Sequence, residues 1–273
     1  MLVVVTVIWG TTFPFVKTLG ETLPSEAIVS VRFLIAALAL APWCRGIDQT
    51  RLRHGVILGL VAFASYATQT IGLRTVSSGR AAFVTGLNVI LVPLALPLLG
   101  RRLPRVALLS AGLAAFGIAL MSWDLGALRF GVGDLWVLAC AVTYAAYVLL
   151  LERFAHQHGT IELSAVQVAT VGACGVIWAL TAHPTRIVRA LSTANFGTWL
   201  TLVYLGVIAV AVTMLLQTKA QKVVAASVAV VVYAMEPVFG ALASFIWRDE
   251  RLARLGFVGA ALIVVAMIVS QQA

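Results

Sequence analysis

Residues 226–247 read ASVAVVVYAMEPVFGALASFIW, an apolar run that Glu236 and Pro237 interrupt near its middle. A helix of this length can cross the roughly 30 Å hydrocarbon core of a bilayer at about 1.5 Å per residue. A carboxylate inside such a run is costly unless it is protonated, paired or hydrated, and a proline removes a backbone hydrogen bond. The run therefore predicts a membrane-spanning helix whose centre faces protein or a wet cavity.

The whole chain has the composition of a membrane protein. Of its 273 residues, 62% are hydrophobic and 11% are charged, whereas a soluble domain is about half apolar and about a quarter charged. The net charge is +9, but Arg and Lys fall between the apolar runs, which is typical of membrane proteins rather than nucleic-acid binders. We expect membrane lipid around the chain and no nucleic-acid partner.

Ten apolar runs of this kind follow one another with short loops between them. They are Leu2–Leu19, Glu26–Trp43, Gly55–Arg74, Ala81–Leu99, Val106–Trp123, Gly133–Glu152, Leu163–Ala182, Gly197–Gln217, Ala226–Trp247 and Leu255–Ser270. The sequence therefore predicts an all-α membrane protein with ten transmembrane helices.

The two halves of the chain resemble each other in order. Trp9 in VIWGTTF lies 135 positions before Tyr144 in AVTYAAY, and Pro93 of the fourth run lies 144 positions before Pro237 of the ninth. A repeat of five spans is odd, so its second copy must enter the membrane from the opposite side. We therefore assign residues 1–123 and 124–273 to two inverted five-helix repeats in one membrane unit, as in many secondary transporters.

Several motifs carry a resemblance to a known family. They are VIWGTTFPFVK at residues 7–17, SVRF at 30–33, SSGRAAFVTGLNVILVPL at 77–94 and EPVFGALASFIWRDERLARLGFVGAALIVVAMIV at 236–269. The chain resembles the EamA branch of the drug/metabolite transporter superfamily over nearly its whole length. The resemblance implies ten helices in two inverted repeats and both termini in the cytoplasm. It also implies export of small metabolites, commonly amino acids, through a central cavity.

Polar and aromatic side chains inside the apolar runs recur at helical spacing, so each set shares one helix face. The candidate substrate-binding residues are Trp9, Phe13, Tyr66, Gln69, Thr70, Thr85, Asn88, Tyr144, Tyr147, Gln217, Tyr233 and Glu236. The alternative for each is helix–helix packing, because Ser, Thr and Gln often bond neighbouring helices without contacting substrate. Together they predict a hydrophobic, aromatic cavity with a few amide and hydroxyl groups.

The charged side chains within the runs include Lys17, Arg32, Glu152 and Glu236. Lys17 is close enough to a helix end to reach the interface, and Glu152 at another helix end is expected to be solvated. Arg32 is expected to make a structural ion pair or carbonyl contact, with an anion contact on the substrate pathway as the alternative. For Glu236, a structural hydrogen bond and a substrate or proton contact remain equally open.

Prolines inside the runs predict the moving parts. Pro14, Pro93 and Pro237 each remove a backbone hydrogen bond within a span. Such breaks are tolerated where the freed carbonyl faces protein or a wet cavity. We expect hinges at these prolines, with Pro93 and Pro237 bending during gating.

The charge inventory limits the substrate. A phosphorylated substrate would need several cations at mid-membrane depth, and Arg32 alone qualifies. The best expectation is a secondary transporter that exports amino acids, above all aromatic and other large apolar ones, by alternating access. The alternative is an exporter of other metabolites or drugs, such as nucleosides, vitamins or lipophilic cations. A channel fits less well, because inverted repeats with helix-breaking prolines favour alternating access.

The sequence contains no motif that indicates an ATPase, an enzyme or a metal-binding protein. No GxxxxGK[ST] phosphate loop and no HExxH motif is present, so we expect neither ATP hydrolysis by this chain nor an enzyme. No His, Cys or carboxylate cluster has metal-ligand spacing, so no metal and no cofactor are predicted. We expect a multi-pass protein of the bacterial inner (plasma) membrane. Basic residues divide almost equally between the two sides, so charge alone does not fix the orientation. A monomer is the working expectation.

Overall fold

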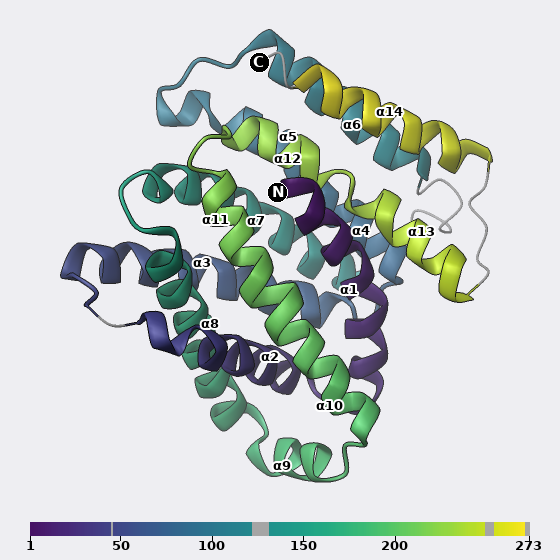
Figure 1. The fold of residues 1–273 in the computed structure, drawn as a ribbon. Helices are drawn as coiled ribbons and strands as arrows, with labels where there is room; N and C mark the ends of the chain where they lie inside the picture. Colours follow the sequence, from purple (N-terminus) through teal and green to yellow (C-terminus); the bar gives the residue numbers. More distant parts are fainter. Residues whose placement is uncertain (45, 122–130, 249–253, 271–273) are drawn as a thin grey trace.

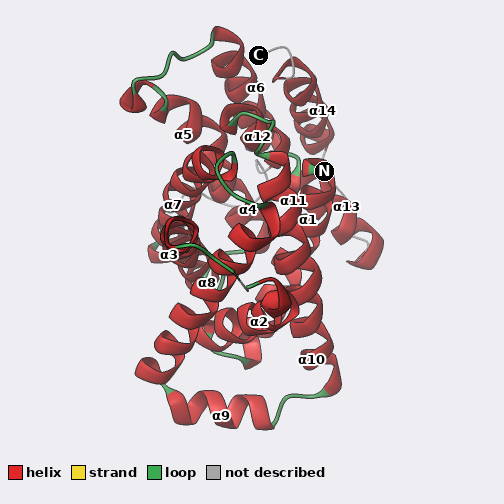
Figure 2. Ribbon diagram, turned by 60° about the vertical axis from the view of Figure 1, so that its left-hand side comes forward, coloured by secondary structure: helices red, strands yellow, loops and turns green. Residues whose placement is uncertain are grey.

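The computed structural model describes residues 1–44, 46–121, 131–248 and 254–270, and all the regular secondary structure in these ranges is helical. The expected boundary between the two repeats, at residues 123 and 124, lies outside the described residues. Figure 1 shows the helices gathered into one bundle, with α6 and α14 side by side at one edge and α9 at the opposite edge. The view in Figure 2 keeps this arrangement.

The first half of the chain forms six α-helices and two short 3-10 turns. They are α1 (Leu2–Thr22), α2 (Ser25–Leu40) with η1 (Ala41–Trp43), α3 (Gln49–Gly72), α4 (Ser78–Gly86), α5 (Asn88–Ala95) with η2 (Pro97–Leu99), and α6 (Arg105–Met121). Two helices begin at side chains that cap free backbone N–H groups: Asp48 accepts from the amide of Arg51 before α3, and Ser77 accepts from the amide of Arg80 before α4. Pro24 precedes α2, where its missing N–H costs nothing.

The second half contains eight α-helices and one π-helical segment. They are α7 (Val132–Ala155), α8 (Thr160–Ala182), α9 (Pro184–Ser192), α10 (Phe196–Val203), η3 (Tyr204–Val212), α11 (Thr213–Ala220), α12 (Ala226–Tyr233), α13 (Glu236–Arg248) and α14 (Arg254–Ser270). The segment η3 is π-helical and continues α10 directly into α11. Widened turns of this kind are rare and occur frequently at functional sites.

Six helical stretches are long and apolar enough to cross a membrane. Among the described residues these are Leu2–Thr22, Ser25–Trp43, Gln49–Gly72, Val132–Ala155, Thr160–Ala182 and Phe196–Ala220. Shorter apolar helices occupy Arg80–Ala95, Arg105–Leu120, Ala226–Gly240 and Leu255–Ser270. Each expected apolar run therefore lies mainly on helices in the part of the chain that is described.

The structure departs from the expected runs in three places. The fourth run is not one helix, because Leu87 interrupts it between α4 and α5, and the ninth is broken at Ala234 and Met235 between α12 and α13. The second break lies directly before Pro237, whose ring disfavours the preceding helical turn. The loop expected before Gly197 contains an additional helix, α9, whose Ile187 is buried.

Helices of one half pack on helices of the other half in corresponding pairs. The third run, α3, packs on α7 and α8, and the eighth run, α10–η3–α11, packs on α1 and α2 in the same relative positions. Likewise α4 and α5 pack on α7, whereas α12 and α13 pack on α1. The helices α2 and α8 pack together, as do α6 and α14. These contacts of one half thus have partner contacts in the other half.

Glycines allow the closest helix approaches. A Cβ atom added to Gly10 on α1 would lie 2.7 Å from the backbone nitrogen of Gly240 on α13, and one added to Gly117 on α6 would lie 2.7 Å from the carbonyl oxygen of Gly259 on α14. Only glycine permits backbones to approach this closely, a common device in membrane helices. Large apolar side chains such as Leu38, Leu109 and Ile177 remain exposed on the outside, which suits a surface covered by lipid rather than water.

Candidate functional site

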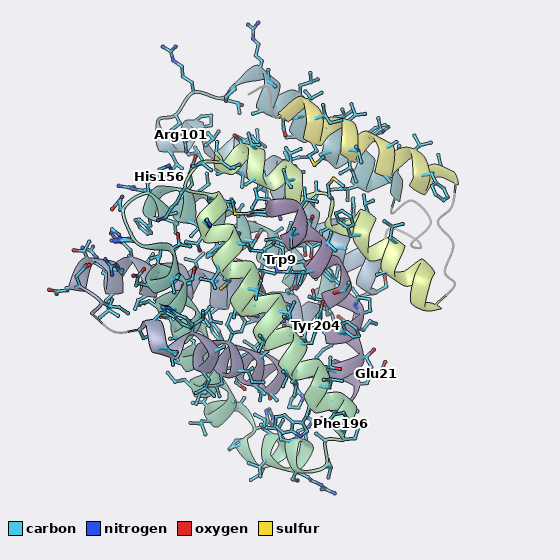
Figure 3. All side chains as sticks on the ribbon, viewed as in Figure 1. Trp9, Glu21, Arg101, His156, Phe196 and Tyr204 are labelled. Atoms are coloured by element: carbon cyan, nitrogen blue, oxygen red, sulfur yellow. The ribbon has the colours of Figure 1, made fainter. Side chains whose placement is uncertain are left out.

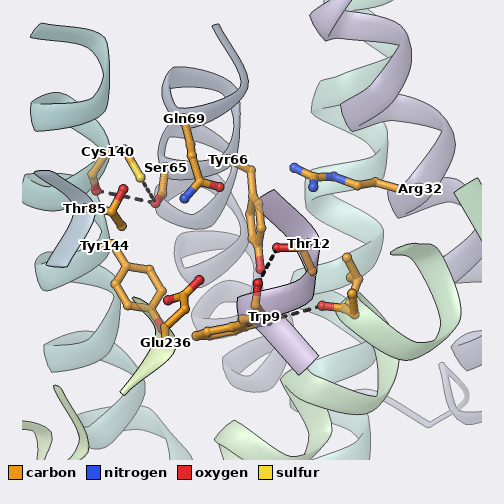
Figure 4. Close-up of a pocket in the computed structure, with 12 residues that line it drawn as sticks. Trp9, Thr12, Arg32, Ser65, Tyr66, Gln69, Thr85, Cys140, Tyr144 and Glu236 are labelled. Atoms are coloured by element: carbon orange, nitrogen blue, oxygen red, sulfur yellow. Dashed lines mark hydrogen bonds between the residues drawn. The ribbon is translucent and has the colours of Figure 1, made fainter. Parts of the chain in front are cut away.

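A central cavity lies where helices from both halves meet. Side chains from α1, α2, α3, α4, α7, η3 and α13 form its wall (Figure 4). The lining residues are Trp9, Thr12, Arg32, Ser65, Tyr66, Gln69, Thr85, Cys140, Tyr144, Ala209, Val210 and Glu236. Both halves of the chain therefore contribute to one site.

Aromatic rings form one wall of this cavity. The Trp9 ring packs against Tyr144 at 5.9 Å between centroids and against Tyr233 at 5.5 Å, and the two tyrosine rings lie 6.1 Å apart. The inclined geometries are those in which the positive edge of one ring meets the negative face of another. This aromatic cluster joins α1, α7 and α12 at the cavity.

The π-helical segment η3 holds Trp9 in place. The indole Nε1–H of Trp9 donates to the carbonyl oxygen of Ala209 at 3.3 Å and to Oγ1 of Thr213 at 3.2 Å. Thr213 in turn donates to the same carbonyl at 2.7 Å. Buried indole groups need such a partner, and here the partner belongs to the helix whose Ala209 and Val210 line the cavity.

Arg32 reaches the cavity from α2 and is 3% exposed. Its guanidinium donates one long hydrogen bond, 3.5 Å, to Oγ1 of Thr70. It also lies 4.8 Å from the ring centroid of Tyr66 and 5.5 Å from that of Phe33. Its Nε atom has no hydrogen-bond partner, and no described carboxylate lies within ion-pair distance. The expected structural ion pair of Arg32 is therefore not present among the described side chains.

Glu236 reaches the cavity from the first residue of α13, directly after the break in the ninth run. It is partly exposed, and no hydrogen bond or ion pair joins its carboxylate to the described part of the chain. In the view of Figure 4, Glu236 lies next to Tyr144 and Trp9, and Arg32 lies on the opposite side of the view. A guanidinium and a carboxyl group thus face one cavity without pairing.

The cavity is small. Its volume is about 40 Å³, which is enough for a few water molecules and too little for an amino acid. The cavity must therefore widen before a metabolite can occupy it.

The structure brings together half of the predicted candidates at the cavity wall. Trp9, Tyr66, Gln69, Thr85, Tyr144 and Glu236 line it. Three more lie one contact behind: Tyr233 packs on Trp9, Gln217 donates to the Tyr144 hydroxyl at 3.0 Å, and Thr70 accepts from Arg32. Whether any of them contacts substrate stays a prediction.

Three candidates lie elsewhere. Phe13 packs in a separate apolar cluster with residues of α2, α4 and η3, and Asn88 is buried on α5 without lining the cavity. Tyr147 is 1% exposed, and its hydroxyl donates to Oε1 of Gln167 at 2.9 Å. Helical spacing predicts which side chains share a face of a helix, but it does not say how deep along that face each side chain lies.

The prediction omitted six lining residues. They are Thr12, Arg32, Ser65, Cys140, Ala209 and Val210. Three had a usable signal, because Thr12 lies three positions after Trp9, Ser65 four before Gln69 and Cys140 four before Tyr144. Cys140 is a free, buried thiol. Ala209 and Val210 carry no sequence signal, since their role comes from the widened backbone of η3.

Ion pairs and hydrogen bonds hold the helix ends on either side of the cavity. Arg80 pairs with Asp134 at 2.5 Å and Arg101 pairs with Glu152 at 2.5 Å, so α4 and the η2 end of the fourth run are both tied to α7. Glu152 is 9% exposed, so the expectation that it is solvated is wrong: the guanidinium of Arg101 covers it. Figure 3 shows Arg101 and His156 at the same end of the molecule.

A second and larger hollow lies on the other side of α1. It measures about 610 Å³ and is lined from α1, α10 and α13, with Thr11, Thr18, Glu21 and Asn195 among its polar groups. At its border the hydroxyl groups of Thr11 and Tyr204 lie 2.6 Å apart. Thr12 faces the central cavity and Thr11 this hollow, so α1 separates the two spaces.

Among the described residues, no three His, Cys, Asp or Glu side chains lie close enough together to hold a metal ion. The site therefore offers aromatic surface, hydroxyl and amide groups, one guanidinium and one carboxylate. Such a site can bind and release a solute, which requires no covalent step.

Comparisons with known proteins agree with this description. The sequence model of the EamA-like transporter family matches residues 1–123 and 131–271. Two proteins of Archaeoglobus fulgidus, each named as an uncharacterized transporter, are 29% identical over 98% of this chain and 83% of the relative, and 23% identical over 98% and 94%. A solved crystal structure superposes with a TM-score of 0.79 at 19% identity, covering 99% of this chain and 95% of the solved chain. At that identity the superposition shows a shared fold alone.

Proposed function

Because this chain belongs to the EamA-like transporter family, and is thus a multi-pass membrane transporter, we propose that it exports amino acids. The leading substrates are amino acids with aromatic or other large apolar side chains. The observation that carries this proposal is the central cavity, whose wall combines aromatic rings with one guanidinium and one carboxylate. Aromatic rings suit an apolar side chain, and the two opposite charges suit a solute that carries both.

The architecture proposed for this function is ten transmembrane helices in two inverted five-helix repeats. Three observations support it: helix contacts that exchange between the halves, two separate segments that match one family model, and apolar helices throughout. Transport then proceeds by alternating access, with the halves rocking about the shared cavity. Pro14 inside α1, Pro93 inside α5 and Pro237 inside α13 are the proposed hinges.

The protein's place in the cell is part of the proposal. We assign it to the plasma membrane, the inner membrane of a bacterium, as a monomer with both termini in the cytoplasm. A transporter of this kind is not an enzyme: the solute leaves as it entered, and neither ATP hydrolysis nor a cofactor is required. The driving force is a gradient of the solute or of protons.

One observation favours a second candidate, the export of lipophilic cations. The Glu236 carboxylate has no described partner and lines the same wall as the Trp9 and Tyr144 rings. Aromatic faces and a carboxylate together attract a desolvated organic cation. This alternative does not use Arg32, whose positive charge would repel such a solute.

The deciding experiment is counter-flow in proteoliposomes. Purified protein is reconstituted with a high internal concentration of each unlabelled solute, and uptake of the labelled solute is followed. The panel holds phenylalanine, leucine, alanine, a nucleoside and a lipophilic cation. We expect rapid exchange of phenylalanine and leucine that exceeds exchange of alanine. Exchange of the cation or nucleoside without any amino acid would reject the leading proposal, and steady ionic conductance would indicate a channel.

A further inference from the structure

The central cavity contains one basic and one acidic side chain that are not paired with each other, and we propose that they divide the recognition of a zwitterion between them. Arg32 binds the carboxylate of the substrate, and Glu236 binds its ammonium group. This inference rests on the proposed function, since it names how an amino acid would be recognised. It assigns Arg32 a direct contact with substrate instead of a structural role.

The first support is the hydrogen-bonding state of Arg32. A guanidinium has five N–H donors in a rigid fork, and here one of them makes a single long bond to Thr70 while Nε has no partner. The side chain is nonetheless 3% exposed. A buried cation without a counter-ion is unfavourable, so a site that keeps one is suited to receive an anion there.

The second support is that Arg32 is already held in position. The Tyr66 ring lies 4.8 Å from the guanidinium carbon and the Phe33 ring 5.5 Å, and these two rings pack edge to face at 4.8 Å. Behind Arg32, a Cβ added to Gly206 of η3 would lie 2.7 Å from the Arg32 carbonyl oxygen. A fixed fork loses little conformational entropy on binding, which favours a planar carboxylate as its partner.

The third support is the state of Glu236. Its carboxylate lines the same cavity without a described hydrogen bond or ion pair, and it is partly exposed to that space. Trp9 and Tyr144 line the wall with it, and aromatic faces add cation–π attraction for an ammonium group. Arg32 and Glu236 do not neutralise each other, because no ion pair joins them. A solute carrying both charges satisfies both residues at once.

A structural role for Arg32 is the competing explanation. Cation–π contacts with Tyr66 and Phe33 could serve only to hold α2 against α3. In that role Arg32 would stabilise the protein, but the affinity of the cavity would not depend on the charge of the ligand. The test must therefore compare affinities for ligands of different charge, and not only protein stability or transport rate.

The experiment compares three ligands that share one carbon skeleton and differ in their charged groups: phenylalanine, phenylalaninamide, whose carboxyl group is an uncharged amide, and 3-phenylpropanoate, which lacks the amine. Competition with labelled phenylalanine counter-flow and ligand-induced thermal stabilisation in detergent are measured for the wild type, Arg32→Gln, Arg32→Lys and Glu236→Gln. Glu26→Gln is the matched control, since Glu26 is buried but lies beside His183, away from the cavity.

We expect the wild type to bind phenylalanine about tenfold or more tightly than either analogue, as charge-assisted hydrogen bonds imply. Arg32→Gln should bind phenylalanine and its amide alike, while Arg32→Lys keeps part of the preference. Glu236→Gln should bind phenylalanine and 3-phenylpropanoate alike. The Glu26→Gln control should keep both preferences.

Each other outcome overturns the inference in a recognisable way. If phenylalanine is exchanged but the wild type binds the amide equally well, or Arg32→Gln keeps the carboxylate preference, Arg32 is structural and the proposed function stands. If no amino acid is exchanged or bound, the proposed function and the inference fall together. If only the carboxylate analogue binds, and does so through Arg32, the substrate is an anion and the ammonium contact of Glu236 is rejected.

Discussion

Trp9, near the start of the chain, makes both ring contacts and hydrogen bonds with residues far away in the sequence. Its ring packs against Tyr144 and Tyr233, and its indole N–H bonds to the Ala209 carbonyl and to Thr213. Each partner belongs to the second half of the chain, whereas Trp9 belongs to the first. A change of one residue here therefore alters the packing between the halves together with the cavity wall.

A histidine pair at one end of the bundle predicts a response to pH. Nδ1 of His54 lies 2.7 Å from Nε2 of His158, so one ring donates and the other must accept. Burial and the neighbouring His54 lower the pKa of His158 below its usual value of 6.5, with Arg51 and Lys222 acting in the same direction and Asp48 against them. The neutral form of His158 is therefore favoured in the folded protein.

The sign of the effect follows from linkage. A histidine whose pKa is lowered by folding stabilises the protein at pH values above 6.5, and this stabilisation is lost as the pH falls through the lowered pKa. We expect the melting temperature in detergent to be constant from pH 8 to 7 and to fall as the pH drops below about 6.5. His158→Asn should flatten this fall, whereas His156→Asn should not. An equal fall in wild type and His158→Asn would contradict the prediction.

Helix α1 separates two spaces and crosses α13 at a pair of glycines. Its Thr12 faces the central cavity and its Thr11 the larger hollow, while Gly10 allows Gly240 to approach. The apolar run of α1 predicted the helix, but its two polar faces are visible only after folding. Similarly, the apolar run at 81–99 predicts one helix, although Gly86 and Asn88, both poor helix formers, flank the break at Leu87.

Gly10→Ala should separate α1 from α13. The added methyl group would meet the Gly240 nitrogen at 2.7 Å, the Phe239 Cβ at 2.9 Å and the Glu236 carbonyl at 3.0 Å, and backbone atoms cannot yield. We expect the free energy of unfolding to fall by about 1–3 kcal/mol, which is typical of overpacking. The control is Gly112→Ala on α6, which has nothing within 4 Å and should be neutral or gain up to about 1 kcal/mol. Equal effects would show that the crossing is loose.

Replacing the prolines tests the proposed hinges. Pro93→Ala with Pro237→Ala restores two backbone N–H donors inside α5 and α13 and should straighten the broken fourth and ninth runs. We expect transport in proteoliposomes to slow far more than expression falls. Leu94→Ala, on an exposed position beside Pro93, serves as the control. Wild-type transport rates in the double variant would reject the hinges.

At the scale of the whole molecule, the two halves are related but are not held alike. The fourth run is tied to α7 by Arg80–Asp134 near one end and Arg101–Glu152 near the other. Among the side chains that the structure describes, no ion pair joins α12 or α13 to α1, which instead meet at glycines. Motion between α1 and the ninth run therefore breaks fewer strong contacts than motion between α7 and the fourth.

Orientation in the membrane can be tested with a native cysteine. Cys44 is free and exposed just after η1, whereas Cys140 is buried. With the N-terminus in the cytoplasm, α1 crosses outward and α2 returns, so Cys44 lies on the cytoplasmic side. A membrane-impermeant maleimide should label inside-out vesicles and not intact cells, and Cys44→Ser should abolish that labelling. Labelling of intact cells would reverse the assigned orientation.

Much of the fold and half of the candidate site follow from the sequence, for physical reasons. Twenty apolar residues have few alternatives to a spanning helix, and helical spacing placed Trp9, Tyr144 and Glu236 on interior faces. Spacing could not separate Tyr147, which bonds to Gln167, from its neighbour Tyr144 at the cavity. The unpaired state of Arg32 depends on every surrounding helix and was beyond any local pattern.

The small volume of the central cavity has a consequence for the electrical insulation of the membrane. A space of about 40 Å³ admits a few water molecules but no hydrated ion, and an ion crossing there would have to shed its hydration shell. Every 100 mV across a membrane drives a unit charge with about 2.3 kcal/mol, so even a slow leak would dissipate the potential on which a cell depends. A protein with so small a central cavity can be abundant in the membrane without conducting ions across it.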